Sequence, residues 1–539
     1  MKQVSKTLAL AVALTLIPLL LTNAPQGNAS VPDFDPKNQF KVSILESEWS
    51  NTPSYLALRK TSKANRNDFE TMLCPKWGEG DCVQTAGNHY YQYEGTVVLP
   101  VCAESSAVYC IEGLELKIGE GNWRKARFNR SIAGPVQTAV PEIGYPGGGT
   151  ISLFETGEDA KSQDLDGYAI YASFELYPTA IDITKPRFER LDLRVTPYTR
   201  ETGVFSEQTA STNVEKDGTK HIRFSGCGLV WCEASQRGRP TDFPKDVAAR
   251  VTLRVPNALT GWLGGRLTKA EIGVTKIDAT TNQLKIGGYP ATVGRAVAIL
   301  ERASLPDNLP DYLKEFIINH PSIDSMAIRG SDVLSFGALD AIKDSIKDKS
   351  VSEETVWSLS SYRNSDTQCL QDDSNLVGLV TTNATAFAGV PPSFEGGILT
   401  YKIGGLHYDS KGGLTSGNYD LVIRSDVARC LYKFTKAPIQ ASISIAYETG
   451  EEKIATQVVN ERDGWLHLGA YNFSYSAPTI RIKLTQDAVA DSPTPSATPT
   501  PKIAIATPKK MSTITCIKGK TTKKITGAIP KCPAGYKKK

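Results

Sequence analysis

The chain has 539 residues, of which 22% are charged and 40% hydrophobic, and its formal net charge is +4. This composition is typical of a globular protein and excludes an intrinsically disordered chain. The charge is unevenly distributed. Removing the ten lysines of Lys509–Lys539 and the two lysines near the N-terminus from the 61 basic residues leaves 49, against 57 acidic residues. The body of the chain is therefore acidic, which argues against general nucleic-acid binding.

Met1–Ala29 has the three parts of a secretory signal peptide. Lys2 and Lys6 give it a positive start, Thr7–Leu21 is apolar with two interruptions, and Gly27 and Ala29 are the small residues before a cleavage site. The apolar run is too short to favour a membrane span, and no later stretch is longer. We expect a protein that is extracellular, either secreted or associated with the cell surface, with no transmembrane span after cleavage.

Two β-rich segments follow, at residues 30–186 and 187–310. Alternation of apolar and polar residues predicts half-buried strands in both, for example at Leu114–Ile118, at Leu191–Val195 and at Val251–Val255. Turn residues such as those of Pro146–Gly149 separate these runs. The pattern does not decide whether residues 30–310 form one domain or two.

Residues 311–350 change to helical spacing. Leu313, Phe316 and Ile317 predict one short helix that ends before Pro321, and the apolar positions of Ala338–Asp348 predict a second. We interpret the segment as a helical connector. Residues 351–486 return to strand alternation with Gly-rich turns, which predicts an antiparallel β-sandwich-like domain. The predicted fold class is therefore mainly β, with several antiparallel sandwich-like domains.

The chain ends with a linker and a basic tail. Residues 487–508 are rich in Pro and Thr, and this composition favours an extended spacer. Residues 509–539 contain ten lysines, two cysteines and no Asp or Glu. Each lysine contributes about 1 kcal/mol of binding free energy near an anionic surface. We expect the tail to bind an anionic cell-wall polymer or the envelope surface; the candidate residues are Lys518, Lys520, Lys523, Lys524, Lys531, Lys537, Lys538 and Lys539. A sorting or export tag is the alternative.

The ten cysteines also indicate export. An even number in an exported chain is typical of disulfides. Zinc is the alternative, but neither a CxxC spacing nor a nearby cluster of histidines is present to favour it. Taken in chain order, the cysteines make five local pairs: Cys74 with Cys82, Cys102 with Cys110, Cys227 with Cys232, Cys369 with Cys430, and Cys516 with Cys532.

Two regions of the sequence resemble known exported proteins. Thr513–Lys524 (TITCIKGKTTKK) and Pro530–Lys539 (PKCPAGYKKK) resemble a terminal motif of many exported actinobacterial proteins. Gly417–Ser425, Ala428–Tyr432 and Asp463–Leu466 resemble a domain of uncharacterised secreted β-rich proteins from that group. The resemblance implies an address outside the cell, and it implies no catalytic residue, ligand or fold.

Motifs for catalysis are scarce. The sequence has no HExxH motif and no GxSxG motif, and we interpret the histidines as structural or exposed (His89, His221, His320, His407 and His467). A catalytic triad assembled only by the fold stays open. The Asp164–Gly167 turn, with Asp159 nearby, is a weak candidate for calcium, and Asp372 and Asp373 are a weaker one. We predict no cofactor and no metal site.

Aromatic side chains make carbohydrate a second candidate partner. The sequence contains seven tryptophans and twenty-one tyrosines, which could stack on sugars, but most such residues in β-sandwiches belong to the core. We expect a non-catalytic surface protein that acts by binding. The alternative is an extracellular hydrolase that acts on polysaccharide or cell wall through two acids brought together by the fold.

Overall fold

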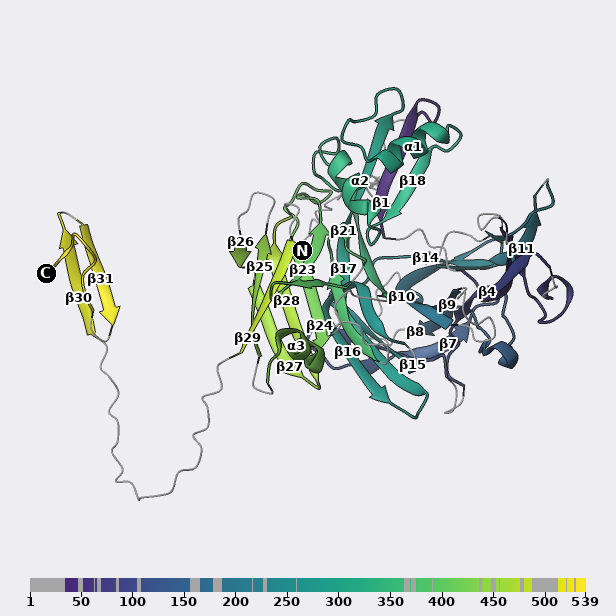
Figure 1. Cartoon of the computed structure of the whole chain (residues 1–539), viewed down its shortest axis with the longest axis horizontal. Helices are drawn as coiled ribbons and strands as arrows, with labels where there is room; N and C mark the ends of the chain where they lie inside the picture. The colour runs from purple at the N-terminus through teal and green to yellow at the C-terminus, as the bar shows by residue number, and fades with distance from the viewer. Residues whose placement is uncertain are drawn as a thin grey trace, which may run out of the picture. The chain divides into compact units, whose positions relative to one another are not determined.

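The protein is described by a computed structural model, in two compact units, Met1–Asp487 and Ala488–Lys539. Each unit is considered by itself (Figure 1). The described residues are 34–46, 52–62, 64, 69–83, 87–103, 108–155, 165–177, 187–215, 217–225, 230–257, 259–362, 369, 375–389, 391–435, 439–446, 452–454, 456–475, 479–486, 512–519, 521–527 and 530–539. The predicted signal peptide and the Pro/Thr-rich linker lie outside them.

The structure is mainly β, as the sequence predicts, with 58% of it in strands and 8% in helices. Among the described residues, the helices are α1 (Asp311–Asn319), α2 (Leu334–Ile342), α3 (Ser425–Tyr432) and the 3-10 turns η1 (Gly80–Cys82) and η2 (Pro141–Ile143). Within this described part, none of the helices has the length and hydropathy needed to cross a membrane.

One continuous path of paired strands runs through the first unit. All of its pairings are antiparallel except that of β16 with β20. Its strands in order of pairing are β3 (Phe69–Leu73), β2 (Tyr55–Ser62), β4 (His89–Val98), β9 (Gly167–Tyr177), β10 (Arg187–Thr202), β19 (Ser352–Tyr362), β16 (Gly261–Lys276), β20 (Leu376–Thr382), β24 (Gly417–Arg424), β28 (Trp465–Phe473) and β27 (Thr456–Arg462).

Shorter strands extend this path at its sides. Strand β8 (Ser152–Glu155) pairs with β9 and also with β7 (Arg127–Ser131). Strand β14 (Gln236–Pro240) pairs with β10 and also with β13 (Trp231–Glu233). A separate hairpin consists of β11 (Thr209–Val214) and β12 (Lys220–Ser225).

The first core lies between this path and a second group of strands. The group consists of the C-terminal half of β16 with β17 (Thr281–Glu301), β15 (Val247–Pro256), β5 (Cys110–Ile118) and β6 (Arg124–Lys125). Residues of the two predicted segments 30–186 and 187–310 bury their side chains in one cluster, which contains Phe174 and Leu191. Strand β9 of the first segment also pairs with strand β10 of the second. The two predicted segments therefore contribute to one shared hydrophobic core, although β1 and the C-terminal end of β17 belong to another.

A small α/β part covers one end of β17. Here β1 (Gln39–Leu45) lies between β17 and β18 (Ser325–Arg329), parallel to β18. Helices α1 and α2 bury Leu313, Ile317, Leu339 and Ile342 against these strands. Both predicted helices are present, although α2 begins before Ala338 and ends at Ile342. The connector segment thus contributes a strand and a core of its own.

The C-terminal part of the first unit is a β-sandwich. One layer is the end of the long path, β20, β24, β28 and β27. The other layer is, in order, β21 (Ala386–Phe387), β23 (Ile398–Gly404), β29 (Thr479–Gln486), β25 (Ile439–Ala446) and β26 (Glu452–Ile454), with β22 (Ser393–Glu395) beside β23. Leu421, Ile423 and Leu468 from the first layer meet Ile443 and Ile482 from the second. The predicted strand alternations produce this buried face.

The structure confirms four of the predicted disulfides. They join Cys74 to Cys82, Cys102 to Cys110, Cys369 to Cys430 and Cys516 to Cys532. Cys232 is also disulfide-bonded, whereas its predicted partner Cys227 lies outside the described residues. Disulfides persist in oxidising environments, so their presence indicates such an environment.

Strand β16 provides a test of how closely the sheets pack. A Cβ atom on Gly265 would lie against the Ser358 carbonyl oxygen and 2.9 Å from the Leu359 Cα, whereas a Cβ atom on Gly273 would meet nothing within 4 Å. We expect Gly265→Ala to lower the free energy of unfolding by about 1–3 kcal/mol, because backbone must move to admit the methyl group. Gly273→Ala is the matched control on the same strand, with an expected change within about 1 kcal/mol. Urea unfolding of both variants measures the difference, and equal midpoints would contradict the close approach.

Candidate functional site

The basic tail folds as a three-stranded antiparallel sheet. Strand β30 (Ser512–Lys518) lies between β31 (Thr521–Gly527) and β32 (Lys537–Lys538). The Lys539 N–H donates to the Thr515 carbonyl oxygen at 2.8 Å, which extends the pairing to the end of the chain. The alternation of Thr and Ile in Thr513–Ile517 explains the central strand, since β-branched residues suit a pleated surface.

The tail disulfide closes this sheet. Cys516 lies on the central strand and is fully buried, and its partner Cys532 belongs to the segment that returns to β32. In the same segment the Tyr536 N–H donates to the Pro533 carbonyl oxygen at 3.0 Å. Lys523 on β31 lies over the Tyr536 ring, with its Nζ 5.4 Å from the ring centroid. A disulfide therefore takes the place of the hydrophobic core that so few residues could not build.

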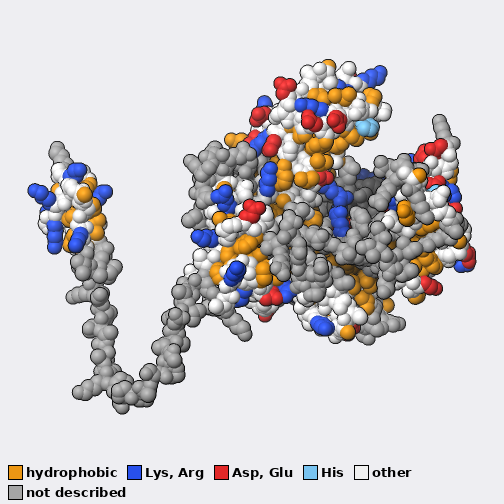
Figure 2. Space-filling model, in the orientation of Figure 1, with side chains coloured by type: hydrophobic (Ala, Val, Ile, Leu, Met, Phe, Trp, Pro, Cys, Tyr) orange, Lys and Arg blue, Asp and Glu red, His pale blue; other side chains and the backbone are white. Residues whose placement is uncertain are grey.

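Seven of the eight predicted tail lysines are described, and all seven are exposed: Lys518, Lys523, Lys524, Lys531, Lys537, Lys538 and Lys539. Lys520 lies outside the described residues. In Figure 2 the visible face of this unit carries blue Lys side chains and no red acidic ones, in keeping with a sequence that has no Asp or Glu between residues 492 and 539. Residues 509–539 are therefore a concentrated positive charge that none of their own side chains neutralises.

The lysines lie on both faces of the small sheet. Lys523 and Lys538 are paired with Cys516 and so share its face, whereas Lys524 is paired with Thr515 and Lys537 with Ile517 on the other. A flat surface can contact only one face of a sheet at a time. A flexible polyanion can contact both.

The body does not bring the five histidines together. They lie on or beside different elements: His89 on β4, His221 on β12, His320 after α1, His407 after β23 and His467 on β28. His407 is paired with Asp348 through Nδ1, and His320 Nδ1 lies 3.0 Å from the Phe316 carbonyl oxygen. Within the described ranges, no three His, Cys, Asp or Glu side chains are placed to hold a metal ion.

The calcium candidates have other partners or lie outside the described residues. The Asp166 carboxylate accepts a hydrogen bond from the Arg200 N–H at 2.5 Å, so it ties the end of β9 to β10. Asp159, Asp164, Asp372 and Asp373 are not among the described residues. The structure therefore gives no further support to calcium at this turn.

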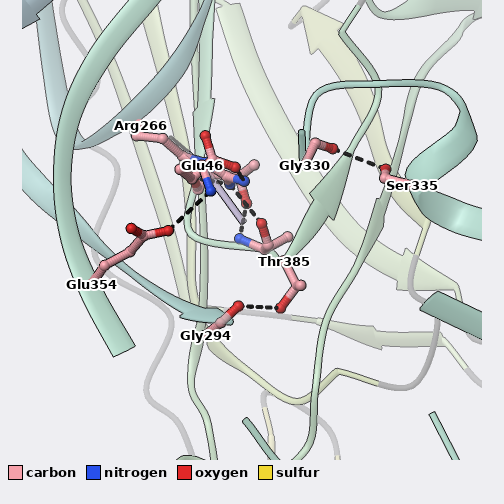
Figure 3. A network of polar contacts seen from close by, with 9 residues as sticks. Glu46, Arg266, Gly294, Gly330, Ser335, Glu354 and Thr385 are labelled. Atoms are coloured by element: carbon pink, nitrogen blue, oxygen red, sulfur yellow. Dashed lines mark hydrogen bonds and ion pairs between the residues drawn. The ribbon is translucent and has the colours of Figure 1, made fainter. Parts of the chain in front are cut away.

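A buried guanidinium lies where several elements meet in the body (Figure 3). The Arg266 side chain is fully buried, and it forms an ion pair with Glu46, whose side chain is 8% exposed. Arg266 Nη1 donates to the carbonyl oxygens of Thr382 at 2.9 Å and Ala384 at 2.6 Å. Its guanidinium also lies 4.2 Å from the centroid of the Phe387 ring. This one side chain links β16, the end of β1 and the segment between β20 and β21.

Neighbouring groups extend the network. Glu354 on β19 accepts a hydrogen bond from the Glu46 N–H at 2.9 Å, and burial raises the pKa of its carboxyl group. Burial disfavours the charged form of a basic group as well, so it lowers the pKa of Arg194 on β10. Gly330, after β18, leaves space for the ion pair, because a Cβ atom there would lie against Glu46, Arg266 and the Thr385 carbonyl oxygen. Since the guanidinium is sealed from solvent, we assign the network a structural role.

A second buried carboxylate lies where the sandwich meets β16. Asp420 on β24 is 5% exposed, and it accepts hydrogen bonds from the Tyr471 hydroxyl and from the Lys269 N–H at 3.1 Å. Lys269 belongs to a β-bulge between Thr268 and Glu271, which turns its N–H toward the sandwich. Burial raises the pKa of Asp420 to about 7, although the Tyr471 hydroxyl, the Lys269 N–H and the Lys269 charge all act in the opposite direction.

The tryptophans are mostly core residues, as expected of a β-sandwich. Trp231, Trp262 and Trp357 are each 1% exposed, and Trp49 lies outside the described residues. Trp465 differs because it lines a cavity of about 360 Å³ at the edge of the sandwich. The sequence does not distinguish this residue from the other six tryptophans. The only local signal is the Asp463–Gly464 turn, which indicates that a strand begins at Trp465.

The Arg266 network predicts a large effect of removing one charge. We expect Arg266→Met to lower the free energy of unfolding by about 3–5 kcal/mol, because it leaves Glu46 buried without its partner. The double variant Glu46→Gln/Arg266→Met should lose less than the sum of the two single variants. Denaturant unfolding of the four proteins measures this coupling. Arg127→Met, in the exposed pair of Arg127 with Glu155, is the control, with an expected loss below about 1 kcal/mol. Additive losses would contradict the paired burial.

Asp420 predicts a specific pH dependence. Its pKa is about 7 in the folded chain and 3.8 for an unperturbed Asp, so between these pH values the folded state holds a proton that the unfolded state has released. The free energy of unfolding should therefore fall as pH rises through this window, by at most about 4 kcal/mol, and level off above it. Asp420→Asn should remove this fall. The measurement is the difference in free energy of unfolding between the variant and the wild type at each pH.

The other titrating groups near Asp420, including His467, are common to both proteins and cancel in that difference. Asp278→Asn serves as a control of opposite sign, because hydrogen bonds from Thr280 lower the pKa of Asp278. As pH falls, the free energy of unfolding of the wild-type protein should decrease relative to that of Asp278→Asn. A difference for Asp420→Asn that does not change with pH would show that Asp420 remains ionised in the folded chain.

Comparison with known proteins gives no assignment: the chain matches no family model, no curated protein and no solved structure. The site must therefore be argued from its own geometry.

Proposed function

We propose that the protein is an exported, non-catalytic binding protein that is held at the cell envelope by its C-terminal unit, Lys509–Lys539. The partner of this unit is an anionic polymer of the envelope. The observation that carries the proposal is the set of seven exposed lysines on a disulfide-closed sheet with no acidic side chain.

The contrast with the body supports a separate role for this unit. The body has more acidic than basic residues, and its ion pairs, such as those of Arg250 with Glu115 and Arg254 with Glu112, balance charge locally. The tail, in contrast, has no Asp or Glu in residues 509–539 with which its lysines could form ion pairs. Attraction to a polyanion is then the largest interaction available to them.

The distribution of the lysines favours a polymer over a lipid surface. Lysines such as Lys523 and Lys524 lie on opposite faces of the sheet. The apolar side chains Ile514, Ile517 and Ile525 are partly buried, so they form no exposed patch for insertion into lipid. A flexible chain of phosphate or carboxylate groups can follow lysines around the unit, whereas a membrane would leave half of them in solvent.

The experiment measures binding of the full chain to a soluble poly(glycerol phosphate). A variant with Lys518, Lys523, Lys524 and Lys531 changed to Gln should bind at least about 100-fold more weakly, since each lysine contributes about 1 kcal/mol near an anionic surface. Wild-type affinity should also fall steeply between low and high salt. The matched control changes Lys37, Lys125, Lys245 and Lys411, four exposed lysines of the body, to Gln.

Two outcomes would overturn the proposal. Equal binding by the tail variant and the wild type would mean that the tail does not hold the polymer. Binding to vesicles with 30% phosphatidylglycerol, without binding to the polymer, would replace the polymer with a lipid surface. Fractionation of cells and medium then tests the role in the native setting, where the tail variant should move from the envelope to the medium.

A further inference from the structure

We propose that the cavity beside Trp465 is a binding site for a neutral saccharide. It has a volume of about 360 Å³ and lies between the ends of β15–β17 and the edge of the C-terminal sandwich. This is within the range of small-molecule sites, at its lower end, and it limits the ligand to a short saccharide. The inference does not depend on the tail, which belongs to the other compact unit.

Two structural elements build opposite sides of the cavity. Strands β15, β16 and β17 contribute Val255, Val274 and Leu284, whereas the sandwich contributes Leu376 and Trp465. Trp465 is 7% exposed and belongs to the first core, so its ring is held in place by packing. These side chains give the cavity apolar walls, which suit the C–H faces of a sugar ring.

Polar side chains are distributed around these walls. Lys276 and Asn282 come from the β16–β17 side, and Asn375, Arg424 and Asp463 come from the sandwich side. Amides both donate and accept hydrogen bonds, a carboxylate accepts, and Lys and Arg donate. A ligand with several hydroxyl groups, each a donor and an acceptor, matches this mixture.

The charges at the cavity favour a neutral ligand. The Arg424 guanidinium is held by Asp426 through two hydrogen bonds, one of them from Nε to Oδ1 at 3.0 Å. Its positive charge is therefore balanced within the sandwich. Lys276 at the end of β16 and Asp463 in the turn before β28 are of opposite sign. The charged side chains in the described lining therefore balance one another, which favours a ligand without net charge.

The turn that presents Asp463 is rigid. Asp463 and Gly464 have φ angles of 51° and 78°, and Arg462 pairs with Trp465 on either side of them. Positive φ at both central residues is the geometry of a tight two-residue hairpin that matches the twist of its strands. The Gly464 carbonyl oxygen also accepts a hydrogen bond from the Ser425 N–H at 2.8 Å. This edge of the cavity is thus preorganised, which lowers the entropic cost of binding.

The lining favours binding without cleavage. Asp463 is the one carboxylate among the described residues that line the cavity. Hydrolysis of a glycoside generally needs two, one on each side of the bond. We therefore assign the cavity to recognition, because the described part of its lining offers the polysaccharide-hydrolase alternative a single acid.

The test titrates the full chain with maltotriose, cellotriose and the trimer of N-acetylglucosamine by isothermal calorimetry. We expect at least one of these neutral saccharides to bind and the charged trimer of galacturonate to bind at least 10-fold more weakly. The titrations are repeated with the tail variant described above, because galacturonate would also bind to tail lysines. Binding of the neutral saccharide should be the same in both proteins.

Two conservative variants locate the site. Asn282→Ala removes a polar group of the wall, and Asp463→Asn removes a charge while keeping a residue that tolerates positive φ. Each should weaken binding by about 10-fold or more, with an unchanged midpoint of thermal unfolding. Asn319→Ala, at an exposed position at the end of α1, is the control. Failure of all three neutral saccharides to bind, tighter binding of galacturonate to the tail variant, or undiminished binding by both site variants would overturn the proposal.

Discussion

The burial of Arg266 is the constraint on which the body of this protein depends. A guanidinium removed from water is stable only when an anion and acceptors surround it, and these come from different parts of the chain: Glu46 at the end of β1, and the carbonyl oxygens of Thr382 and Ala384 beyond β20. Satisfying one side chain thus fixes the small α/β part, the central strand β16 and the start of the C-terminal sandwich relative to one another. The specificity of this arrangement comes from polar groups, because apolar packing alone tolerates many registers.

Strand β16 also determines where ligands can reach the body. Its first half pairs with β19 and β20, and its second half pairs with β17 on both sides of the bulge at Lys269. The bulge places a backbone N–H against Asp420 of the sandwich. Near the C-terminal end of the strand, Val274 and Lys276 line the cavity that also contains Trp465. One strand thus belongs to both groups of paired strands and forms part of the cavity wall.

The sequence predicts local features of this structure much better than distant ones. Alternation at Leu191–Val195 and at Val251–Val255 correctly predicts strands, and short spacings correctly pair cysteines such as Cys516 and Cys532. The pairing of β5 with β15 joins residues more than a hundred positions apart, and no local pattern encodes it. Arg266 lies between Gly265 and Leu267, and as a charged residue it has the properties of a surface position by sequence alone. Its partner Glu46 is equally inconspicuous, so the network could not be predicted.

The two proposed sites divide recognition between two kinds of force. Ion pairing of the tail lysines with a polyanion is long-range, sensitive to salt and tolerant of geometry. A cavity with balanced charges, in contrast, depends on shape and on hydrogen bonds that form only at contact. Holding a protein at an envelope requires the first property, and choosing among saccharides requires the second. Since the lysines and the cavity lie in separate compact units, a substitution in one site leaves the packing around the other unchanged. Two sites within the body would not be independent in this way, because the buried Arg266 network couples its parts.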